Sequence, residues 1–338
     1  RKATRMGNAA KPKEVLRSGA MIADVADTGI ETISAPLGHA LVDLARKDDR
    51  IVGLSADLAK YTDMHIFRDE LPDRFYQVGM AEMAMMGAAA GFAQEGFVPF
   101  VSTYSVFATR RAYDWLLLDI AEQNLNVNLV CALPGLTTGY GPSHMAFDDL
   151  AILRACPNLT ILDPCDATDI ESATPAMVDD EGPTYMRLLR GRVPKVLHNY
   201  DGQFELGKAR RLRTGESALV ISSGLTTQRV LEATEELDKD GINVEVLHLA
   251  TIKPLDEAAI LHAIACSERP IFTAENHSVV GGLFESVAAA MAKSGKTTKI
   301  TPISLPDAFP EAGALPTLEQ KYGISADQIA KTIRSSQG

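Results

Sequence analysis

Glu82 is the residue whose surroundings most clearly call for a chemical explanation. It is the only charged residue in the run from Gly79 to Ala93, which otherwise contains only glycine, alanine, methionine and phenylalanine. Such a run predicts a buried helix, and a carboxylate buried without a partner is costly or takes up a proton. Two interpretations follow: a structural carboxylate held by a backbone amide or an arginine, or a carboxyl that transfers protons in catalysis.

Two further segments contain residues suited to ligand binding. Tyr104 and Phe107 stand three apart at the C-terminal end of an apolar run, the end at which open α/β sheets bind ligands. Their rings suit a flat heterocycle, although ordinary core aromatics would show the same pattern. The glycine-rich segment 135–144 ends in His144, which can donate, accept or carry a proton. A tight turn without a function is the alternative for this segment.

The composition is that of a soluble protein with about two domains. The chain has 338 residues, is 46% hydrophobic and carries a net charge of −11, which disfavours a general nucleic-acid or membrane-surface binder. We find neither a secretory signal nor an apolar run of the roughly 18 residues that a membrane span needs, so we expect a cytoplasmic protein. The four cysteines form no CxxC pair and suit reduced thiols, and the seven histidines show no zinc-binding spacing.

Strands and helices are expected to alternate twice along the chain. In the first half we expect strands at 51–55, 97–104, 127–133, 159–162 and 184–189, and helices at 37–46, 81–93, 110–123, 149–156 and 167–178. In the second half we expect strands at 218–222, 244–249, 270–273 and 300–305, and helices at 227–237, 255–265, 283–292 and 326–333. This alternation predicts an α/β fold with two mostly parallel sheets.

The domain boundaries follow from the same pattern. The first domain is expected at 31–195 and the second at 205–338, joined by a polar linker at 196–204. Residues 1–30 are expected to form an N-terminal extension, in which 13–26 has the pattern of a helix.

A series of short motifs runs in order along the two expected domains. They are Leu54–Leu58, Pro72–Phe75, Val78–Glu82, Pro99–Tyr104 with Phe107, Arg111–Asp114, His144, Leu150–Asn158, Asp163–Ala167, Thr251–Asp256, and Glu275–Ser278 with Gly281 and Gly282. Together they resemble the C-terminal half of the transketolase family, and the chain is similar to the second subunit of split transketolases, in which two polypeptides form the enzyme. The resemblance implies a pyrimidine-binding domain at 31–195 and a transketolase C-terminal domain at 205–338.

The resemblance implies a site for thiamine diphosphate. Glu82 matches the catalytic glutamate, which in the family hydrogen-bonds N1′ of the aminopyrimidine and so promotes loss of the proton at C2 of the thiazolium. Phe107 matches the aromatic that stacks on the pyrimidine, and Tyr104 matches its upstream companion. Asp57, in the first motif, is also assigned to the cofactor site.

The resemblance also implies a substrate site, in which several residues depart from the family. His144 matches a histidine that faces the substrate, and Arg190 matches an arginine that binds the sugar phosphate, as a forked guanidinium is suited to do. Tyr140 takes the place of an acidic pair that reads a ketose hydroxyl. Family substrate residues are also replaced at Ser34, Tyr61 and Leu133. We therefore expect a more apolar pocket and a non-standard substrate such as apulose 4-phosphate, an unphosphorylated ketose or a 2-oxoacid.

The family's other half is expected to come from a second polypeptide. That half holds Mg²⁺ and the diphosphate through a Gly-Asp-Gly motif, which does not occur in these 338 residues. We expect an α2β2 assembly that transfers a two-carbon ketol unit from a ketose or its phosphate to an aldehyde. One alternative is a subunit of another thiamine enzyme, which forms acyloins or decarboxylates a 2-oxoacid. The other is a non-catalytic regulatory partner.

Overall fold

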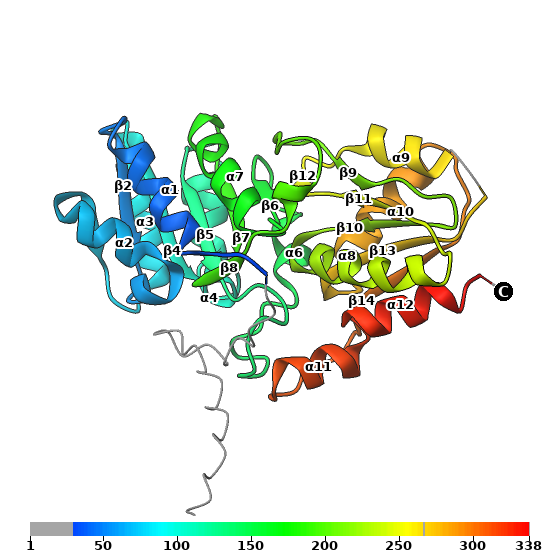
Figure 1. Ribbon diagram of the computed structural model, residues 1–338. Coiled ribbons are helices and arrows are strands. Elements are labelled where there is room, and N and C mark those ends of the chain that lie inside the picture. The colour runs from blue at the N-terminus through cyan, green and yellow to red at the C-terminus, as the bar shows by residue number, and fades with distance from the viewer. Residues whose placement is uncertain (1–29, 266–267, 338) are drawn as a thin grey trace, which may run out of the picture.

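The computed structural model describes residues 30–265 and 268–337, which form two open sheets side by side (Figure 1). The first sheet has seven strands in the order β12 (Thr251–Lys253), β6 (Thr160–Leu162), β7 (Thr184–Leu188), β5 (Asn128–Ala132), β4 (Val98–Tyr104), β2 (Ile51–Ser55) and β3 (Phe75–Gln77). Its strand pairs are parallel except that β12 runs antiparallel to β6. Because β12 belongs to the second half of the chain, that half supplies the edge strand of the first sheet.

Helices cover both faces of the first sheet, as buried parallel strands require. One face packs against α1 (Pro36–Ala45), α2 (Met64–Glu70) and α7 (Ala167–Asp179). The other packs against α3 (Glu82–Gln94), α4 (Ser105–Arg110), α5 (Tyr113–Trp115), the π-helix η3 (Leu116–Ala121) and α6 (Asp149–Leu153). A small antiparallel sheet pairs β1 (Thr32–Ser34) with β8 (Arg192–Pro194). Short 3₁₀ turns complete the described part of this half: η1 (Ala59–Thr62), η2 (Pro72–Arg74) and η4 (Leu197–Asn199).

The second sheet has the order β14 (Ile300–Leu305), β13 (Ile271–Ser278), β10 (Ala218–Ser222), β11 (Val244–His248) and β9 (Arg210–Arg213), of which β9 is antiparallel. Helices α8 (Gly224–Lys239) and α12 (Ala326–Arg334) cover one face, and α9 (Glu257–Ala265) and α10 (Leu283–Lys293) cover the other. Helix α11 (Leu315–Tyr322) lies below α12 in Figure 1. None of the helices described is long and apolar enough to cross a membrane.

The predicted α/β fold class is confirmed, with differences in individual elements. The expected helix at 110–123 is wrong, because the structure breaks this segment into α4, α5 and η3. The expected linker begins with the short turn η4, and β3, α2 and α11 were not foreseen. The expected helix at 13–26 lies outside the described residues. Cys131, Cys156 and Cys165 are buried free thiols.

The prediction that the Glu82 helix is buried is also corrected. Helix α3 buries only one side, along Met85, Met86 and Ala89, and leaves Met83 41% exposed and the preceding Met80 80% exposed. One side of this apolar helix is therefore left uncovered by residues 30–265 and 268–337, although its composition would suit a core on both sides.

A buried ion cluster joins the two halves. Arg187, on β7, donates to Asp149 at 2.9 Å and 3.2 Å and to Asp163 at 3.1 Å, and only 1% of its side chain is exposed. Its Nη2 also donates to the carbonyl of Asn276, on β13, at 2.9 Å. Asp163 in turn accepts from Ser223 of the second half at 2.8 Å. The two sheets therefore share one desolvated set of charges.

Replacing Arg187 by methionine should lower the free energy of unfolding by about 3–5 kcal/mol, because Asp149 and Asp163 would stay buried without their cation. Urea denaturation measures this loss. Arg334→Met is the matched control, since Arg334 pairs with exposed carboxylates and its loss should cost at most about 1 kcal/mol. Equal losses in the two variants would contradict the assigned importance of the cluster.

Candidate active site

Glu82 lies in the first turn of α3, beside the C-terminal ends of β2 and β3. Gly79 has a φ of +74°, a conformation that glycine adopts without strain, and it turns the chain from β3 toward the helix. Glu82 is 3% exposed. Its position at a helix N-terminus favours a negative charge, because the first-turn amides carry a partial positive charge. The local fold therefore explains how a carboxyl group is tolerated within an apolar run.

Arg111 is the charged partner of Glu82. Its Nη1 donates to Glu82 Oε1 at 3.2 Å. Its guanidinium carbon also lies 3.9 Å from the ring centroid of Phe107, in cation–π contact. A flat, N–H-bearing group thus touches the carboxylate and the aromatic face at once. The arginine partner considered from the sequence is present, and it shows that both surfaces are accessible to one planar group.

The structure brings together four aromatic side chains from three segments. Tyr104 ends β4 and lies 5.7 Å from Phe107 of α4, centroid to centroid. His144, from the loop after β5, lies 5.6 Å from Phe107 and 6.1 Å from Tyr104. Tyr140, on the same loop, lies 5.6 Å from His144 and is 45% exposed. His144 Nδ1 is 2.9 Å from Ser143 Oγ. Residues separated along the chain therefore form one aromatic wall next to Glu82.

Arg190 lies at the far side of this wall. Its guanidinium carbon is 5.9 Å from the Tyr104 ring and 6.0 Å from the Tyr61 ring. Burial lowers the pKa of Arg190, while neighbouring Tyr104 and Asp63 act in the opposite direction. A half-buried cation among tyrosine hydroxyls is suited to an anionic group on a small molecule.

Asp63 supports the Arg190 turn and was missed by sequence reasoning. Its two carboxylate oxygens accept from the backbone N–H of Gly191 at 3.1 Å and 3.0 Å. Burial raises the pKa of Asp63 to about 7, against the opposing effects of the Gly191 hydrogen bond and the charge of Arg190. Asp63 follows a short turn with no hydrophobic period, so the sequence offers no signal for it.

Asp57 has a different environment from the rest of the predicted set. It is exposed at the end of β2 with a φ of +60°. Its backbone N–H donates to Gln77 Oε1 at 2.7 Å, and its carboxylate accepts from Gln77 Nε2 at 3.4 Å. Its neighbour Leu58 packs against the cluster that contains Tyr104 and Phe107. Leu133 is buried in that cluster. Over 30–265 and 268–337, no three His, Cys, Asp or Glu side chains are grouped to hold a metal ion.

Comparison with known proteins identifies the family. A protein of Sinorhizobium fredii described as a transketolase family protein is 59% identical over 330 residues, which are 97% of this chain and 95% of that protein. The chain belongs to the transketolase family. Its residues 31–195 match the transketolase pyrimidine binding domain, and residues 207–329 match the transketolase C-terminal domain. The resemblance seen in the sequence is confirmed, and membership of the family implies dependence on thiamine diphosphate.

Two further transketolase relatives align over nearly their full length. A 6-deoxy-6-sulfo-D-fructose transketolase subunit from a Clostridium species is 37% identical over 86% of this chain and 90% of that subunit. A solved structure described as a split gene transketolase, inactive beta4 tetramer, has a TM-score of 0.80 and 33% identity, and the match covers 90% of this chain and 98% of that one.

The raised pKa of Asp63 predicts how the free energy of unfolding depends on pH. Because folding raises this pKa from about 4 to about 7, the stability it contributes is complete below about pH 4 and is lost as the pH rises to about 7. An asparagine side chain at this position would stay neutral throughout. Relative to the wild type, Asp63→Asn should therefore gain about 2.5 kcal/mol in free energy of unfolding between pH 5 and pH 8.

Urea denaturation at the two pH values measures this difference. The contribution of buried Glu275, whose pKa burial also raises to about 7, is common to both proteins and cancels. Asp307→Asn removes an exposed carboxylate and controls for the loss of one negative charge. If Asp63→Asn and wild type changed in parallel with pH, the assignment of a raised pKa to Asp63 would be wrong.

Proposed function

We propose that this chain is the β subunit of a split transketolase, which transfers a two-carbon ketol unit from a ketose or its phosphate to an aldehyde. The observation that carries the proposal is that Glu82, Phe107 and His144 lie close together beyond the C-terminal ends of strands in the first sheet. Arg111 contacts both Glu82 and Phe107, and Phe107 contacts His144. A buried carboxyl beside an aromatic face and a histidine suits proton transfer next to a flat cofactor.

Thiamine diphosphate fits the residues of this site. The aminopyrimidine is a flat ring that offers a nitrogen to a carboxyl group and a face to an aromatic ring. Arg111, itself planar, already makes both contacts, with Glu82 and with Phe107. We infer that the guanidinium of Arg111 occupies the place that the pyrimidine takes, and that Arg111, half-exposed, moves aside when the cofactor binds.

The proposed chemistry is divided between cofactor and chain. Bound thiamine diphosphate supplies the carbon nucleophile that attacks a ketose carbonyl. Glu82 would share a proton with the pyrimidine nitrogen, and its burial would keep that hydrogen bond from water. Phe107 would hold the ring flat, with Tyr104 behind it. His144 would face the substrate and hold or donate a proton at the hydroxyl or carbonyl oxygens next to the reacting carbon.

The proposed substrate has an anionic group remote from its carbonyl. Arg190 would bind that group as a forked donor, with Asp63 holding the adjoining turn. Leu133 and Tyr140 replace polar residues of the family and favour a donor other than the usual pentose phosphates. Apulose 4-phosphate remains a proposed donor, and similarity to the 6-deoxy-6-sulfo-D-fructose transketolase subunit adds a sulfonated sugar to the candidates.

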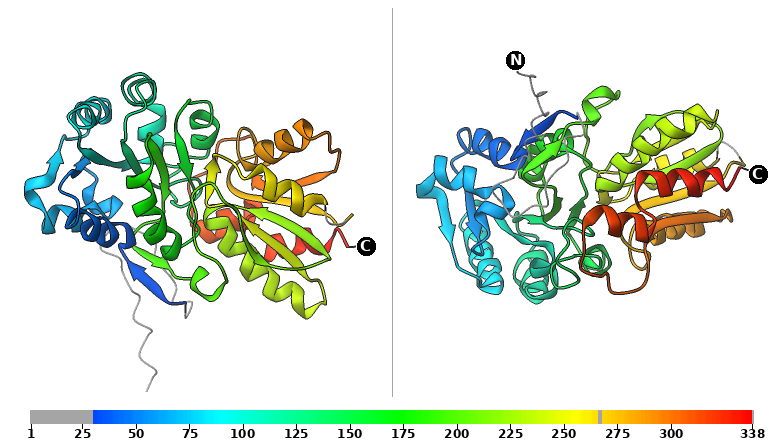
Figure 2. Two further views of the ribbon diagram at one scale, coloured as in Figure 1. Left: turned by 90° about the horizontal axis from the view of Figure 1, so that it is seen from above. Right: turned by 60° about the horizontal axis from the view of Figure 1, so that its bottom comes forward.

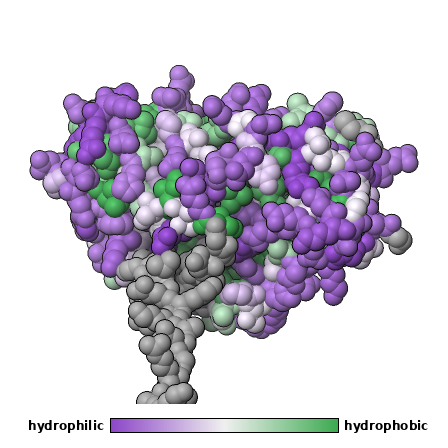
Figure 3. All heavy atoms as spheres, in the orientation of Figure 1, coloured by the Kyte–Doolittle hydropathy of each residue, from purple (hydrophilic) through white to green (hydrophobic). Residues whose placement is uncertain are grey.

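The proposed partner is a subunit that carries Gly-Asp-Gly and holds Mg²⁺ and the diphosphate, in an α2β2 assembly. A surface for it runs along α3, from the end that bears Glu82 to the end that bears Phe92. Six of the ten exposed large hydrophobic residues described lie on β3, on α3 with its flanks, or on α5 and η3: Tyr76, Met80, Met83, Phe97, Trp115 and Leu118. We call this set the α3 face. By contrast, the face in Figure 3 is mostly hydrophilic, with hydrophobic residues in small groups. A subunit holding the far end of a cofactor bound at Glu82 would meet the α3 face.

Glu82→Gln tests the proposed catalytic role. In the complex with the Gly-Asp-Gly subunit, this variant should slow deuterium exchange at C2 of thiamine diphosphate by about 100-fold or more, because glutamine cannot take the proton. Quench-flow with NMR detection measures the exchange. Glu95→Gln, at the exposed C-terminal end of the same helix, should exchange at the wild-type rate.

Turnover of a donor panel completes this test. The panel contains xylulose 5-phosphate, apulose 4-phosphate, 6-deoxy-6-sulfofructose and hydroxypyruvate, each with ribose 5-phosphate or glyceraldehyde 3-phosphate as acceptor. Transfer from at least one donor, lost in Glu82→Gln, is expected. Wild-type exchange in Glu82→Gln, or no transfer from any donor by the assembled complex, would refute the proposed function.

A charge on the α3 face should prevent assembly. Leu118→Glu would place a carboxylate in an apolar contact and should weaken binding of the Gly-Asp-Gly subunit by about 100-fold or more. Val280→Glu, at an equally exposed valine of the second half, should leave binding unchanged. Analytical ultracentrifugation and titration calorimetry measure both. The chain alone should bind thiamine diphosphate weakly, so tight binding without the partner would contradict the shared site.

A further inference from the structure

The loop that carries His144 is held from both halves of the molecule. It spans residues 134–148, between β5 and α6, and we call it the His144 loop. On the side of the first sheet, Arg110 donates to the carbonyls of Pro142 at 2.7 Å and Met145 at 3.2 Å. The same guanidinium pairs with Asp148 at 2.7 Å. These contacts hold the stretch of the loop around and after His144, at Pro142, Met145 and Asp148.

The two ends of the His144 loop are held by β13 of the second half. Asn276 Oδ1 accepts from the backbone N–H of Leu136 at 2.8 Å. The backbone N–H of Ser278, two residues further along the strand, donates to the carbonyl of Phe147 at 2.8 Å. One strand of the second sheet therefore bonds to both the entry and the exit of the loop.

The tip of the loop is held by the segment before α11. The backbone N–H of Gly313 donates to the carbonyl of Gly139 at 3.0 Å. The ring of Phe309 meets that of Phe147 edge to face, with centroids 5.9 Å apart. Figure 2 shows the stretch that leads to α11 running next to the first half of the molecule.

The glycines of the loop are explained by these contacts. A Cβ added to Gly135 would lie 2.1 Å from the carbonyl oxygen of Asn276, and one added to Gly139 would lie 2.2 Å from that of Gly313. Both distances are far below van der Waals contact, so neither position has room for a side chain. The glycine-rich composition allows the second half to approach the loop closely.

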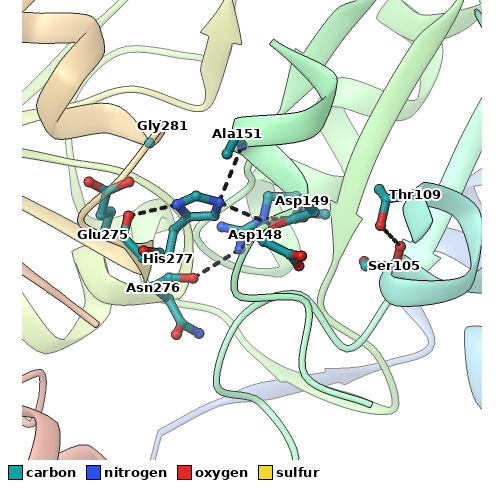
Figure 4. Close-up of polar contacts among 12 residues, drawn as sticks. Ser105, Thr109, Asp148, Asp149, Ala151, Glu275, Asn276, His277 and Gly281 are labelled. Carbon is teal, nitrogen blue, oxygen red and sulfur yellow. Dashed lines mark hydrogen bonds and ion pairs between the residues drawn. The ribbon is translucent and has the colours of Figure 1, made fainter. Parts of the chain in front are cut away.

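Asn276 is itself fixed by the buried ion cluster. It is 3% exposed, and its carbonyl accepts from Arg187 at 2.9 Å. Figure 4 shows Asn276 and His277 on one strand facing Asp149 and Ala151, which begin the helix after the loop. His277 Nε2 accepts from the backbone N–H of Ala151 at 3.4 Å. These contacts fix the backbone of Asn276, and its side-chain oxygen therefore lies within hydrogen-bonding distance of the Leu136 N–H.

We propose that Asn276 is a positioning residue of the active site, through which the second half of the chain holds the His144 loop against the Tyr104–Phe107 wall. Asn276 acts through the loop and does not touch the reacting atoms. The inference rests on the proposed function for the role of His144. It assigns to the C-terminal domain the task of setting the distance between His144 and the substrate.

Hydrogen exchange of the full chain tests whether the second half holds the loop. Asn276→Ala removes the acceptor of the Leu136 amide, and it should speed backbone exchange within 135–147 by about fivefold or more. Phe309→Ala changes a side chain that is 80% exposed, so it should fold normally and also speed exchange there. Asn243→Ala, at an exposed asparagine of the second half, is the control. Unchanged exchange in both test variants would overturn the proposal.

Kinetics of the complex with the Gly-Asp-Gly subunit test positioning. With the donor turned over in the panel above, Asn276→Ala should lower kcat/KM by about tenfold, while C2 exchange, which depends on Glu82, stays within about twofold of wild type. Asn276→Asp keeps an oxygen for the Leu136 amide and should recover most of the loss. A parallel fall in C2 exchange, or no recovery, would overturn the positioning role. If the wild-type complex transfers no ketol unit, the proposed function fails, and hydrogen exchange alone decides whether Asn276 holds the loop.

Discussion

The ion pairs of the buried Arg187 guanidinium with Asp149 and Asp163 are the interaction on which the rest of the structure depends. A charge with 1% of its side chain exposed is tolerable only if carboxylates stay within bonding distance, and Asp149 and Asp163 meet that demand. Asp149 begins the helix after the His144 loop, and Asp163 also accepts from Ser223 of the second half. Separation of the halves would therefore break contacts to buried charges. The cluster fixes the mutual position of the sheet that bears the candidate site and of the sheet whose strand β13 holds the His144 loop.

Helix α3 shows a second constraint, which the described part of the chain does not satisfy by itself. Its alanines, glycines and methionines suit a core, yet Met80 and Met83 remain exposed beside the buried Glu82. The Glu82 carboxyl lies at the boundary between the core and this uncovered apolar surface. Covering the surface would shield the carboxyl further from water. In the proposed assembly, docking of the partner and enclosure of the Glu82 hydrogen bond are then the same event, which explains why an acid and an apolar helix side occur together.

The sequence predicted the sheets better than the contacts between them. The bounds of β2, β10 and β14 agree with the predicted strands, because apolar, mostly β-branched or leucine-rich runs are unambiguous. The segment after Phe107 was misjudged because its period is helical throughout, while the structure contains a break and a π-helix. Glu82 was found because it is a lone charge in an apolar run. Arg187 is likewise a charge within a mostly apolar strand, Thr184–Leu188. Asp63 gave no such signal, and Asn276 lies in the motif Glu275–Ser278 without any predicted role, since the importance of both arises from tertiary contacts.

The glycine-rich loop shows why such a motif is ambiguous before the fold is known. In the sequence its glycines suit either a tight turn or close approach to a ligand. In the structure Gly135 and Gly139 approach backbone carbonyls of the second half, and Tyr140 and His144 contact each other in the aromatic wall. The loop thus separates two tasks along its length: Gly135 and Gly139 form contacts with the second half, and Tyr140 and His144 belong to the aromatic wall. Residue 140 can therefore change without disturbing the glycine contacts, so the proposed substrate pocket can depart from the family while the backbone contacts that hold the loop stay in place.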